Sequence, residues 1–295
     1  MWILNETILY VKRNIRHKKI IIVGSASLQQ KCEKISDICF MDEDKMLEGL
    51  SFQTVKQAVK HRNLHAVKRT GWYFQQFLKL GYARVCDEEE YLVWDADTIP
   101  LKRLAMSRRD GRLFFDVKSE YHLPYFKTIQ TLLPDLRIRE TGFSFISEHM
   151  VLRKEIVLSL LNKIEENDNI PGQIYWEKII NAIERSELPR SGFSEFETYG
   201  QFVLNFYKDE YLIRRIPALR NGELYLRKDF TEADLKWAAK SFDIISFEGR
   251  GKFYKYEFLW NGKLRKIISL KTVVWLDEMF FPSHKLIKDV RRVKR

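Results

Sequence analysis

Apolar and polar positions along the first third of the chain predict alternating helices and strands. Residues 3–15 are apolar at helical spacing and end in a basic segment. A second amphipathic helix is predicted over residues 70–81, where Gly81 is placed to end it. Short apolar runs, typical of buried parallel strands, stand at residues 19–25, 38–44 and 91–94. This alternation predicts an α/β fold with a mostly parallel sheet flanked by helices.

The remainder of the chain continues this pattern and then changes character. Strands are predicted at residues 113–117 and 143–147, and helices at residues 151–165, 174–185 and 200–207. Beyond residue 209 the pattern favours short β-like segments and one helix, at residues 211–216, 223–226, 236–240 (the helix), 242–247 and 267–270. We therefore expect a catalytic domain of residues 1–208. A small β-containing extension, residues 209–295, is expected to pack on it and to end in a basic tail.

Two carboxylates one residue apart, Asp95 and Asp97, directly follow an apolar run. Because Pro100 cannot continue a central strand, we expect the aspartates at the carboxyl end of a strand, where open α/β sheets bind ligands. Side chains two apart on extended backbone point the same way, so the carboxylates repel each other unless a cation lies between them. Mg²⁺ and Mn²⁺ suit such hard oxygen ligands and bridge nucleotide phosphates. The alternative is that both aspartates only cap a turn.

Polar residues interrupt the apolar pattern of the helix predicted over residues 70–81. Gln75 is expected to be solvated, whereas Gln76 and Lys79 are neighbours at a spacing of three residues. If their face looks toward Asp95, Lys79 supplies positive charge to phosphates and Gln76 hydrogen-bonds sugar or phosphate oxygens. The alternative is that this face is simply solvated.

His149, Glu195 and Glu197 are further candidates for the chemistry. His149 follows the strand predicted at residues 143–147, and it either completes a metal shell, contacts an acceptor, or forms a structural hydrogen bond. Both glutamates follow Ser194, a good helix cap, and acids in a first turn favour the helix dipole. A carboxylate at a helix start beside a pocket can also act as a general base, so both roles stay open.

Composition narrows the class of protein. The 295 residues are 45% hydrophobic, which allows a real core, and the net charge is +11. Three cysteines without metal-ligand spacing suit a reducing cytosol, where we expect all three to be buried. A basic leader is absent, and no apolar stretch approaches the roughly 20 residues that span a bilayer, so we expect a cytoplasmic protein. The basic and apolar residues 283–295 favour peripheral contact with the anionic inner membrane surface, or else form a solvated terminus.

Four segments together resemble a known group of enzymes: residues 69–79, 93–98, 147–150 and 194–200. The run Gly-Trp-Tyr-x-Gln-Gln-x-Leu-Lys, followed by Asp-Ala-Asp-Thr, resembles bacterial glycosyltransferase-like proteins of the GT-A type from surface-polysaccharide gene clusters. The resemblance implies a GT-A-like α/β fold with a DxD motif. One feature departs from it: a basic helix precedes the first strand, so the nucleoside base is held either by the loop at residues 24–27 or in another way.

The resemblance also implies an activity. A sugar would pass from a nucleotide-diphosphate donor, UDP-linked, to a hydroxyl of a bacterial surface glycan such as capsule or lipopolysaccharide, or of its lipid-linked precursor. The cofactor would be Mn²⁺ or Mg²⁺, held with the diphosphate by Asp95 and Asp97. The other residues that carry over are on the donor side or in the active centre: Trp72, Gln76 and Lys79 for the donor, and His149 and Glu195 for the centre.

Two other classes of function fit parts of the sequence. A basic module with 20 Phe, 13 Tyr and 7 Trp could bind nucleic acid, but most aromatics fall in apolar runs and no nucleic-acid motif is visible, so no nucleic-acid partner is expected. A metal-dependent nucleotidyltransferase or phosphodiesterase would use the same aspartate pair. It usually needs a further carboxylate at a matching strand end, and Asp116 keeps this alternative open.

Overall fold

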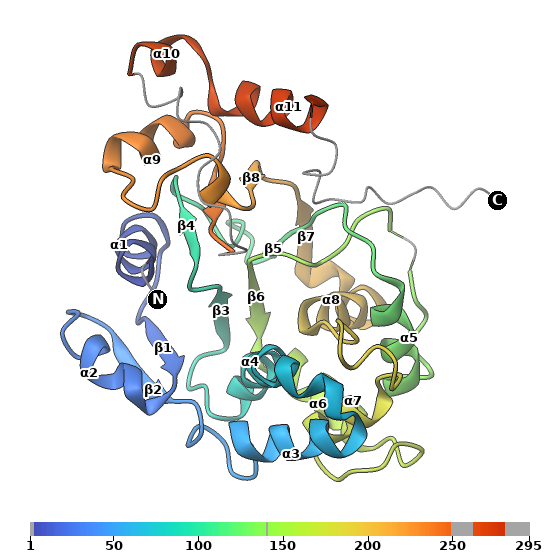
Figure 1. The fold of residues 1–295 in the computed structure, drawn as a ribbon. Coiled ribbons are helices and arrows are strands. Elements are labelled where there is room, and N and C mark those ends of the chain that lie inside the picture. Colours follow the sequence, from blue (N-terminus) through green and yellow to red (C-terminus); the bar gives the residue numbers. More distant parts are fainter. Residues whose placement is uncertain (1–2, 140, 249–261, 281–295) are drawn as a thin grey trace.

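A computed structural model describes residues 3–139, 141–248 and 262–280 (Figure 1). The first part of the chain contains α1 (Leu4–Asn14), β1 (Ile21–Gly24), α2 (Gln29–Cys32), β2 (Cys39–Asp42), α3 (Phe52–Arg62), α4 (Thr70–Gly81) and β3 (Glu90–Trp94). The middle part contains β4 (Thr98–Pro100), β5 (Leu113–Asp116), α5 (Leu123–Leu132), β6 (His149–Arg153), α6 (Lys154–Glu165), α7 (Tyr175–Ala182) and α8 (Glu195–Phe206). The last part contains β7 (Tyr211–Arg214), β8 (Ala218–Leu219), α9 (Glu232–Ala239), β9 (Ile244–Ser246), α10 (Gly262–Ile267) and α11 (Leu270–Phe280). The fold is mixed α/β, as the sequence pattern predicts.

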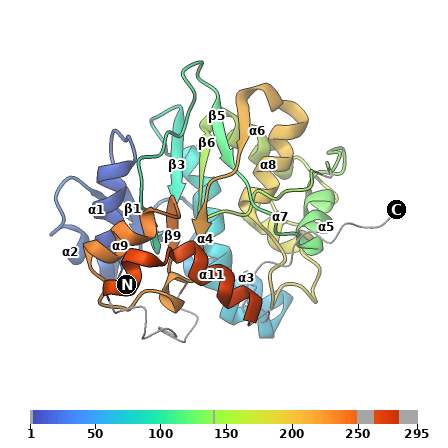
Figure 2. The same cartoon turned by 90° about the horizontal axis from the view of Figure 1, so that it is seen from above.

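The strands form several small sheets with both pairing directions. Within the described residues, β1 pairs with β2, β5 with β7 and β8 with β9 in parallel, whereas β3 pairs with β6 and β4 with β9 antiparallel. The strand that precedes the aspartates is therefore in an antiparallel pair, and its last residue, Trp94, lies opposite His149. Both views show β1, β3, β6 and β5 following one another across the molecule (Figures 1 and 2).

Two apolar clusters hold the elements together. In the larger one, helices α3, α4, α6, α7 and α8 pack against β5 and β6 through buried side chains such as Phe77, Phe115 and Tyr199. The smaller one joins α1, β4, α9, β9 and α11 through Ile99 and Leu270, among others. Burial of apolar surface at about 25 cal/mol per Å² stabilises both. The aspartate turn lies between β3 and β4, where the chain passes from the first cluster to the second.

Residues after 208 complete these sheets. Strand β7 pairs with β5, and β9 pairs with β4, so contacts cross the expected boundary between residues 208 and 209. Within the described ranges, no helix is both long and apolar enough to cross a membrane.

Several predicted elements are wrong. Residues 143–147 form only a single bridge, because the Phe145 amide donates to the Glu197 side chain instead of to a strand, and the actual strand is β6. Helix α6 consequently starts at Lys154 rather than at 151, and α8 starts five residues before the predicted 200. The segment 223–226 is no strand: Asn221, at φ 55°, turns the chain into a short 3-10 helix. Residues 267–270 join two helices, and helix α5 has no counterpart in the prediction.

Two single residues have surroundings that the sequence pattern does not indicate. Helix α4 ends at Gly81 as predicted, but Gly81 has an ordinary helical φ of −63° and a 3-10 turn follows directly at Tyr82–Arg84. A Cβ at this position would lie 2.4 Å from side-chain atoms of Leu47 and Tyr175, so the glycine permits close packing. Cys32 and Cys86 are buried as expected, but Cys39 is exposed, because β2 lies beside β1 alone.

Candidate functional site

The aspartate pair lies on a tight turn at the end of β3. The Thr98 amide donates to the Asp95 carbonyl at 3.0 Å, and the Trp94 indole Nε1 donates to the Thr98 carbonyl at 2.7 Å. The Asp95 amide donates to the Glu148 carbonyl at 2.9 Å, which fixes the turn to the residue before β6. The predicted position at a strand end is therefore confirmed, although the backbone between the aspartates turns rather than staying extended.

Lys79 joins the aspartate turn to the start of α8. Its Nζ lies 2.9 Å from Asp95 Oδ1 and 2.9 Å from Glu195 Oε1, and 4.6 Å from the centre of the Phe196 ring. Burial alone would lower the pKa of Lys79, but Asp95 and Glu195 outweigh it and raise the pKa above its ordinary value. Of the two alternatives left open for this face of α4, the structure has Lys79 directed toward Asp95 rather than solvated, and the ammonium group stays charged.

Asp97 is the carboxylate of the pair that has no counter-charge within the described part of the chain. Burial first, then the charge of Asp95, raises its pKa from 3.8 to about 6, and Glu248 adds to the effect. The only side chain that donates to it in the described part of the chain is Thr98, whose hydroxyl is 3.4 Å from Oδ1. No Lys or Arg of the described residues forms an ion pair with Asp97. Ionised Asp97 is therefore unfavourable until a cation approaches.

A second group of charges stands next to the turn. The buried Glu148 carboxylate accepts from Lys118 and, at 2.9 Å, from Arg220 Nε. Burial raises the pKa of Glu148, but Lys118 and Arg220 outweigh it and lower the pKa to about 2. Arg220 also pairs with Glu120 and, at 3.2 Å, with Glu248. Sequence reasoning missed this group; only the quoted segment 147–150, which contains Glu148, could have pointed to it.

The centre is acidic although the protein is basic. Among the described residues, these ion pairs and neighbouring charges join six carboxylates and three cations: Asp95, Asp97, Glu120, Glu148, Glu195 and Glu248 with Lys79, Lys118 and Arg220. The formal charges of these nine described groups sum to −3, whereas the whole chain has a net charge of +11.

Gln76 and Trp72, the other donor-side candidates, have different surroundings. Gln76 is 2% exposed; its Oε1 accepts from the Glu195 amide and its Nε2 donates to the Trp72 carbonyl, both at 3.1 Å. Gln76 therefore ties α4 to the first residue of α8 and helps to aim Glu195 at Lys79. Trp72 is half-buried beneath Arg69, whose guanidinium is 4.2 Å from the ring centre. Gln75 is exposed, as expected.

His149 and Glu197 are both buried, and neither contacts Lys79. The His149 ring is 3% exposed, stacks on Trp94 with 4.6 Å between ring centres, and lies 2.9 Å from Asp116 through Nε2. Glu197 is fully buried; it accepts from the Phe145 amide at 3.0 Å, and burial raises its pKa to about 7. Residues two apart on a helix face different ways, so only Glu195 reaches Lys79.

Asp116 ends β5 as expected, but both of its carboxylate oxygens already accept hydrogen bonds. Arg214 donates to Oδ1 at 2.6 Å and to Oδ2 at 2.7 Å, and His149 adds its contact to Oδ2. Burial raises the pKa of Asp116, but the bonds from Arg214 and His149 outweigh it and lower the pKa. Among the residues that the structure describes, no three His, Cys, Asp or Glu side chains cluster as a metal site. A cation on Asp95 and Asp97 would therefore take its other ligands from water or a bound phosphate.

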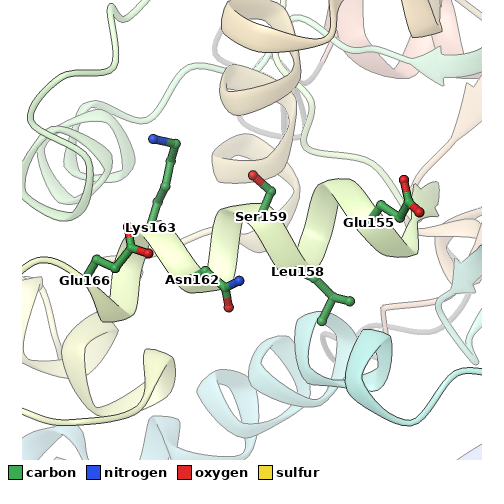
Figure 3. A pocket seen from close by; sticks show the side chains of 6 residues that line it. All are labelled: Glu155, Leu158, Ser159, Asn162, Lys163 and Glu166. Atoms are coloured by element: carbon green, nitrogen blue, oxygen red, sulfur yellow. The ribbon is translucent and has the colours of Figure 1, made fainter.

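Surface hollows lie over other residues. Figure 3 shows one along α6, with lining side chains from that helix and from Glu166, which directly follows it: Glu155, Leu158, Ser159, Asn162, Lys163 and Glu166. Another lies between α3 and α7 and includes His61 and Glu177. Neither contains a residue of the aspartate turn or its partners. A hollow lined by a single helix offers a ligand contacts from one side only.

Comparison with known proteins gives a family without an assigned activity. No curated protein matches the chain. The sequence profile of a family of unknown function, DUF6492, matches residues 2–239. The matched range includes the aspartate turn, Lys79, Glu148, Glu195 and Arg220, and it stops before Glu248. The chain therefore belongs to the DUF6492 family.

Proposed function

We propose that the protein is a metal-dependent glycosyltransferase of the GT-A type. The observation that carries the proposal is Asp97, a half-buried carboxylate beside Asp95 with a pKa of about 6 and no basic partner among the described residues. A pair of carboxylates at a strand end with this deficit of positive charge fits Mn²⁺ or Mg²⁺. The donor would be a nucleotide-diphosphate sugar, UDP-linked, and the acceptor a hydroxyl of a bacterial surface glycan or its lipid-linked precursor.

The residues around the turn have distinct roles in this proposal. When bound, the cation neutralises the diphosphate leaving group as a Lewis acid. Lys79, held 2.9 Å from Asp95, places a fixed positive charge where the leaving group becomes more negative. Glu195 holds Lys79 through Oε1 and is 5% exposed, so its contacts favour positioning of Lys79. If the enzyme inverts the sugar, Glu195 is also the candidate to take the acceptor's proton.

The other two classes receive less support. A two-metal nucleotidyltransferase or phosphodiesterase would need Asp116 as a free ligand, and Arg214 and His149 occupy both of its oxygens. A nucleic-acid module would need exposed stacking aromatics, whereas many aromatics lie in the larger core cluster.

A membrane surface is the proposed partner for acceptor delivery on the cytoplasmic side. The expected contact through residues 283–295 lies outside the described residues. Helix α11, just before them, presents Trp275 (59% exposed), Met279 and Phe280 (67% exposed) outward, with Lys271 on the same side. Exposed apolar side chains beside cations suit an interface rich in anionic lipid.

Thermal unfolding with and without Mn²⁺, against UDP and a panel of nucleotide sugars, tests the function. We expect a stabilising shift with one donor only when Mn²⁺ is present. Asp97→Asn should abolish that shift, whereas Asp135→Asn, which alters an exposed aspartate elsewhere, should keep it. A donor shift that is the same in EDTA, or that survives in Asp97→Asn, would reject the metal role. Absence of any donor shift in the wild type would reject the nucleotide-sugar substrate.

A further inference from the structure

A continuous line of contacts runs from Arg214 to the aspartate turn. Arg214 holds both oxygens of Asp116, Asp116 holds His149 Nε2, and His149 stacks on Trp94 with an angle of 27° between the rings. Trp94 then donates to the Thr98 carbonyl and so spans the turn. This line of contacts thus links β5, β7 and β6 to Trp94, at the end of β3, and to Thr98, the two residues that flank the turn.

The chemistry of these contacts makes the line rigid. The bidentate Arg214–Asp116 pair has fixed geometry and is shielded, because Asp116 is buried. Its carboxylate holds the Nε2 side of the His149 ring at 2.9 Å, and the buried Nδ1 has no hydrogen-bond partner among the described residues. The imidazole is therefore oriented, and it presents one face to Trp94. At the middle of this line, Asp116 is 7% and His149 is 3% exposed, so neither side chain is open to a substrate hydroxyl.

We infer that Arg214, Asp116 and His149 form a positioning chain that acts through Trp94 to hold the Asp95–Asp97 turn in the geometry that binds a divalent cation. The inference rests on the proposed metal function. It assigns His149 to positioning rather than to contact with the acceptor. It also gives a role to Asp116, whose carboxylate is paired with Arg214: Asp116 orients the His149 ring rather than binding a metal.

The test compares three single variants in the full-length protein. Trp94→Phe keeps an aromatic ring on His149 but loses the N–H that spans the turn. His149→Phe keeps the stacking and loses the link to Asp116. Trp237→Phe is the matched control, since its indole also donates to a carbonyl, that of Ile268 at 3.1 Å, but in the smaller core cluster.

Two measurements are made on each variant: the Kd for Mn²⁺ alone, and the hydrogen-exchange rate of the Thr98 amide without metal. Supporting contacts around metal ligands typically change affinity by 10–100-fold. We expect Trp94→Phe to raise the Kd by about tenfold or more and to speed Thr98 exchange. His149→Phe should act in the same direction but less, and Trp237→Phe should change neither.

The outcomes separate the two claims. Wild-type Kd and wild-type Thr98 exchange in Trp94→Phe would overturn the positioning chain while leaving the metal site intact. If the wild type binds no Mn²⁺, the metal role in the proposed function is rejected. The exchange rate of the Thr98 amide alone then tests the positioning chain. Faster exchange in Trp94→Phe but not in Trp237→Phe supports the positioning chain, and equal rates reject it.

Discussion

Replacing Asp97 by Asn should make the metal-free protein more stable while removing its response to metal. The pKa of Asp97 is raised from 3.8 to about 6, chiefly by burial and by Asp95. Each pH unit of such a difference corresponds to about 1.36 kcal/mol, so ionised Asp97 costs the metal-free fold at most about 3 kcal/mol. Because the folded pKa of this acid lies above the unfolded value, the cost appears as pH rises from 3.8 to 6 and is complete above 6.

The size of the expected shift follows. At pH 8 without metal, Asp97→Asn should gain up to about 3 kcal/mol, or roughly 6 °C in Tm for a chain of this length. At pH 4 the gain should shrink to about 0.5 kcal/mol, because there the folded wild type is protonated at Asp97 and the unfolded chain nearly half so. If Mn²⁺ binds Asp97 as proposed, it must displace the proton that Asp97 carries at low pH, so the affinity for Mn²⁺ should rise about tenfold per pH unit below pH 6 and level off above it.

Differential scanning calorimetry at pH 4 and pH 8, with EDTA or with Mn²⁺, measures all of these terms. The control is Asp135→Asn, in which an exposed aspartate with no ion pair among the described residues changes in the same way. An Asp97→Asn protein that is less stable than wild type at pH 8 in EDTA would refute the electrostatic reasoning. So would an Asp97→Asn protein that is still stabilised by Mn²⁺ as strongly as the wild type.

Three further changes test other parts of the molecule. Glu197→Gln should have a free energy of unfolding, relative to wild type, that is about 2–3 kcal/mol more favourable at pH 9, above the Glu197 pKa of about 7, than at pH 4, because glutamine carries no buried charge. Glutamine can still accept from Phe145 but not also from Gln201, as Glu197 does at 3.3 Å, and this loss is the same at both pH values. A urea titration at both pH values measures the difference, and equal effects would contradict it. Gly200→Ala would place a Cβ 2.2 Å from the Phe145 ring and should lower the free energy of unfolding by about 1–3 kcal/mol. Gly71→Ala is the control and should cause no loss, because its Cβ would meet only Phe52 at an ordinary 3.9 Å; equal losses would exclude the packing explanation. Replacing Trp275 and Met279 together by Ser should reduce flotation with anionic liposomes several-fold without altering Tm, and flotation equal to wild type would reject α11 as a membrane contact.

The parts of the site that sequence predicts are those set by neighbours in the chain. Apolar periodicity predicts α4 to the residue, and the end of an apolar run places Asp95 at a strand end. Lys79 reaches Asp95 because the helix and the strand are joined by only eight residues and pack on one another. Spacing alone could not choose between Glu195 and Glu197, and the choice is made by Gln76, which binds the Glu195 amide from another helix.

What the sequence does not reveal comes from contacts far apart in the chain. Lys118 and Arg220 reach Glu148 from segments 30 and 72 residues away that have no periodicity of their own. The false strand at residues 143–147 has the same cause, since the Phe145 amide finds a side-chain acceptor 52 residues away, which no local pattern indicates. His149 keeps its position beside a strand, but at the start of β6 rather than after the predicted one, and this places its ring against Trp94.

The charge balance at the turn predicts a metal-dependent order of binding for the proposed donor. Asp95, Asp97, Glu195 and Lys79 together carry −2 when all are ionised. One divalent cation neutralises this set, whereas a diphosphate that arrives alone adds further negative charge. Two like unit charges about 4 Å apart repel each other by about 4 kcal/mol at an effective dielectric constant of 20. A single uncompensated carboxylate can therefore lower the affinity for a diphosphate by roughly a thousandfold. Lys79 alone cannot offset this repulsion, because its single positive charge is already shared between Asp95 and Glu195. If the protein binds a nucleotide diphosphate as proposed, the cation has to be present before, or together with, the diphosphate, and the donor-induced shift should vanish in EDTA even though Lys79 remains in place.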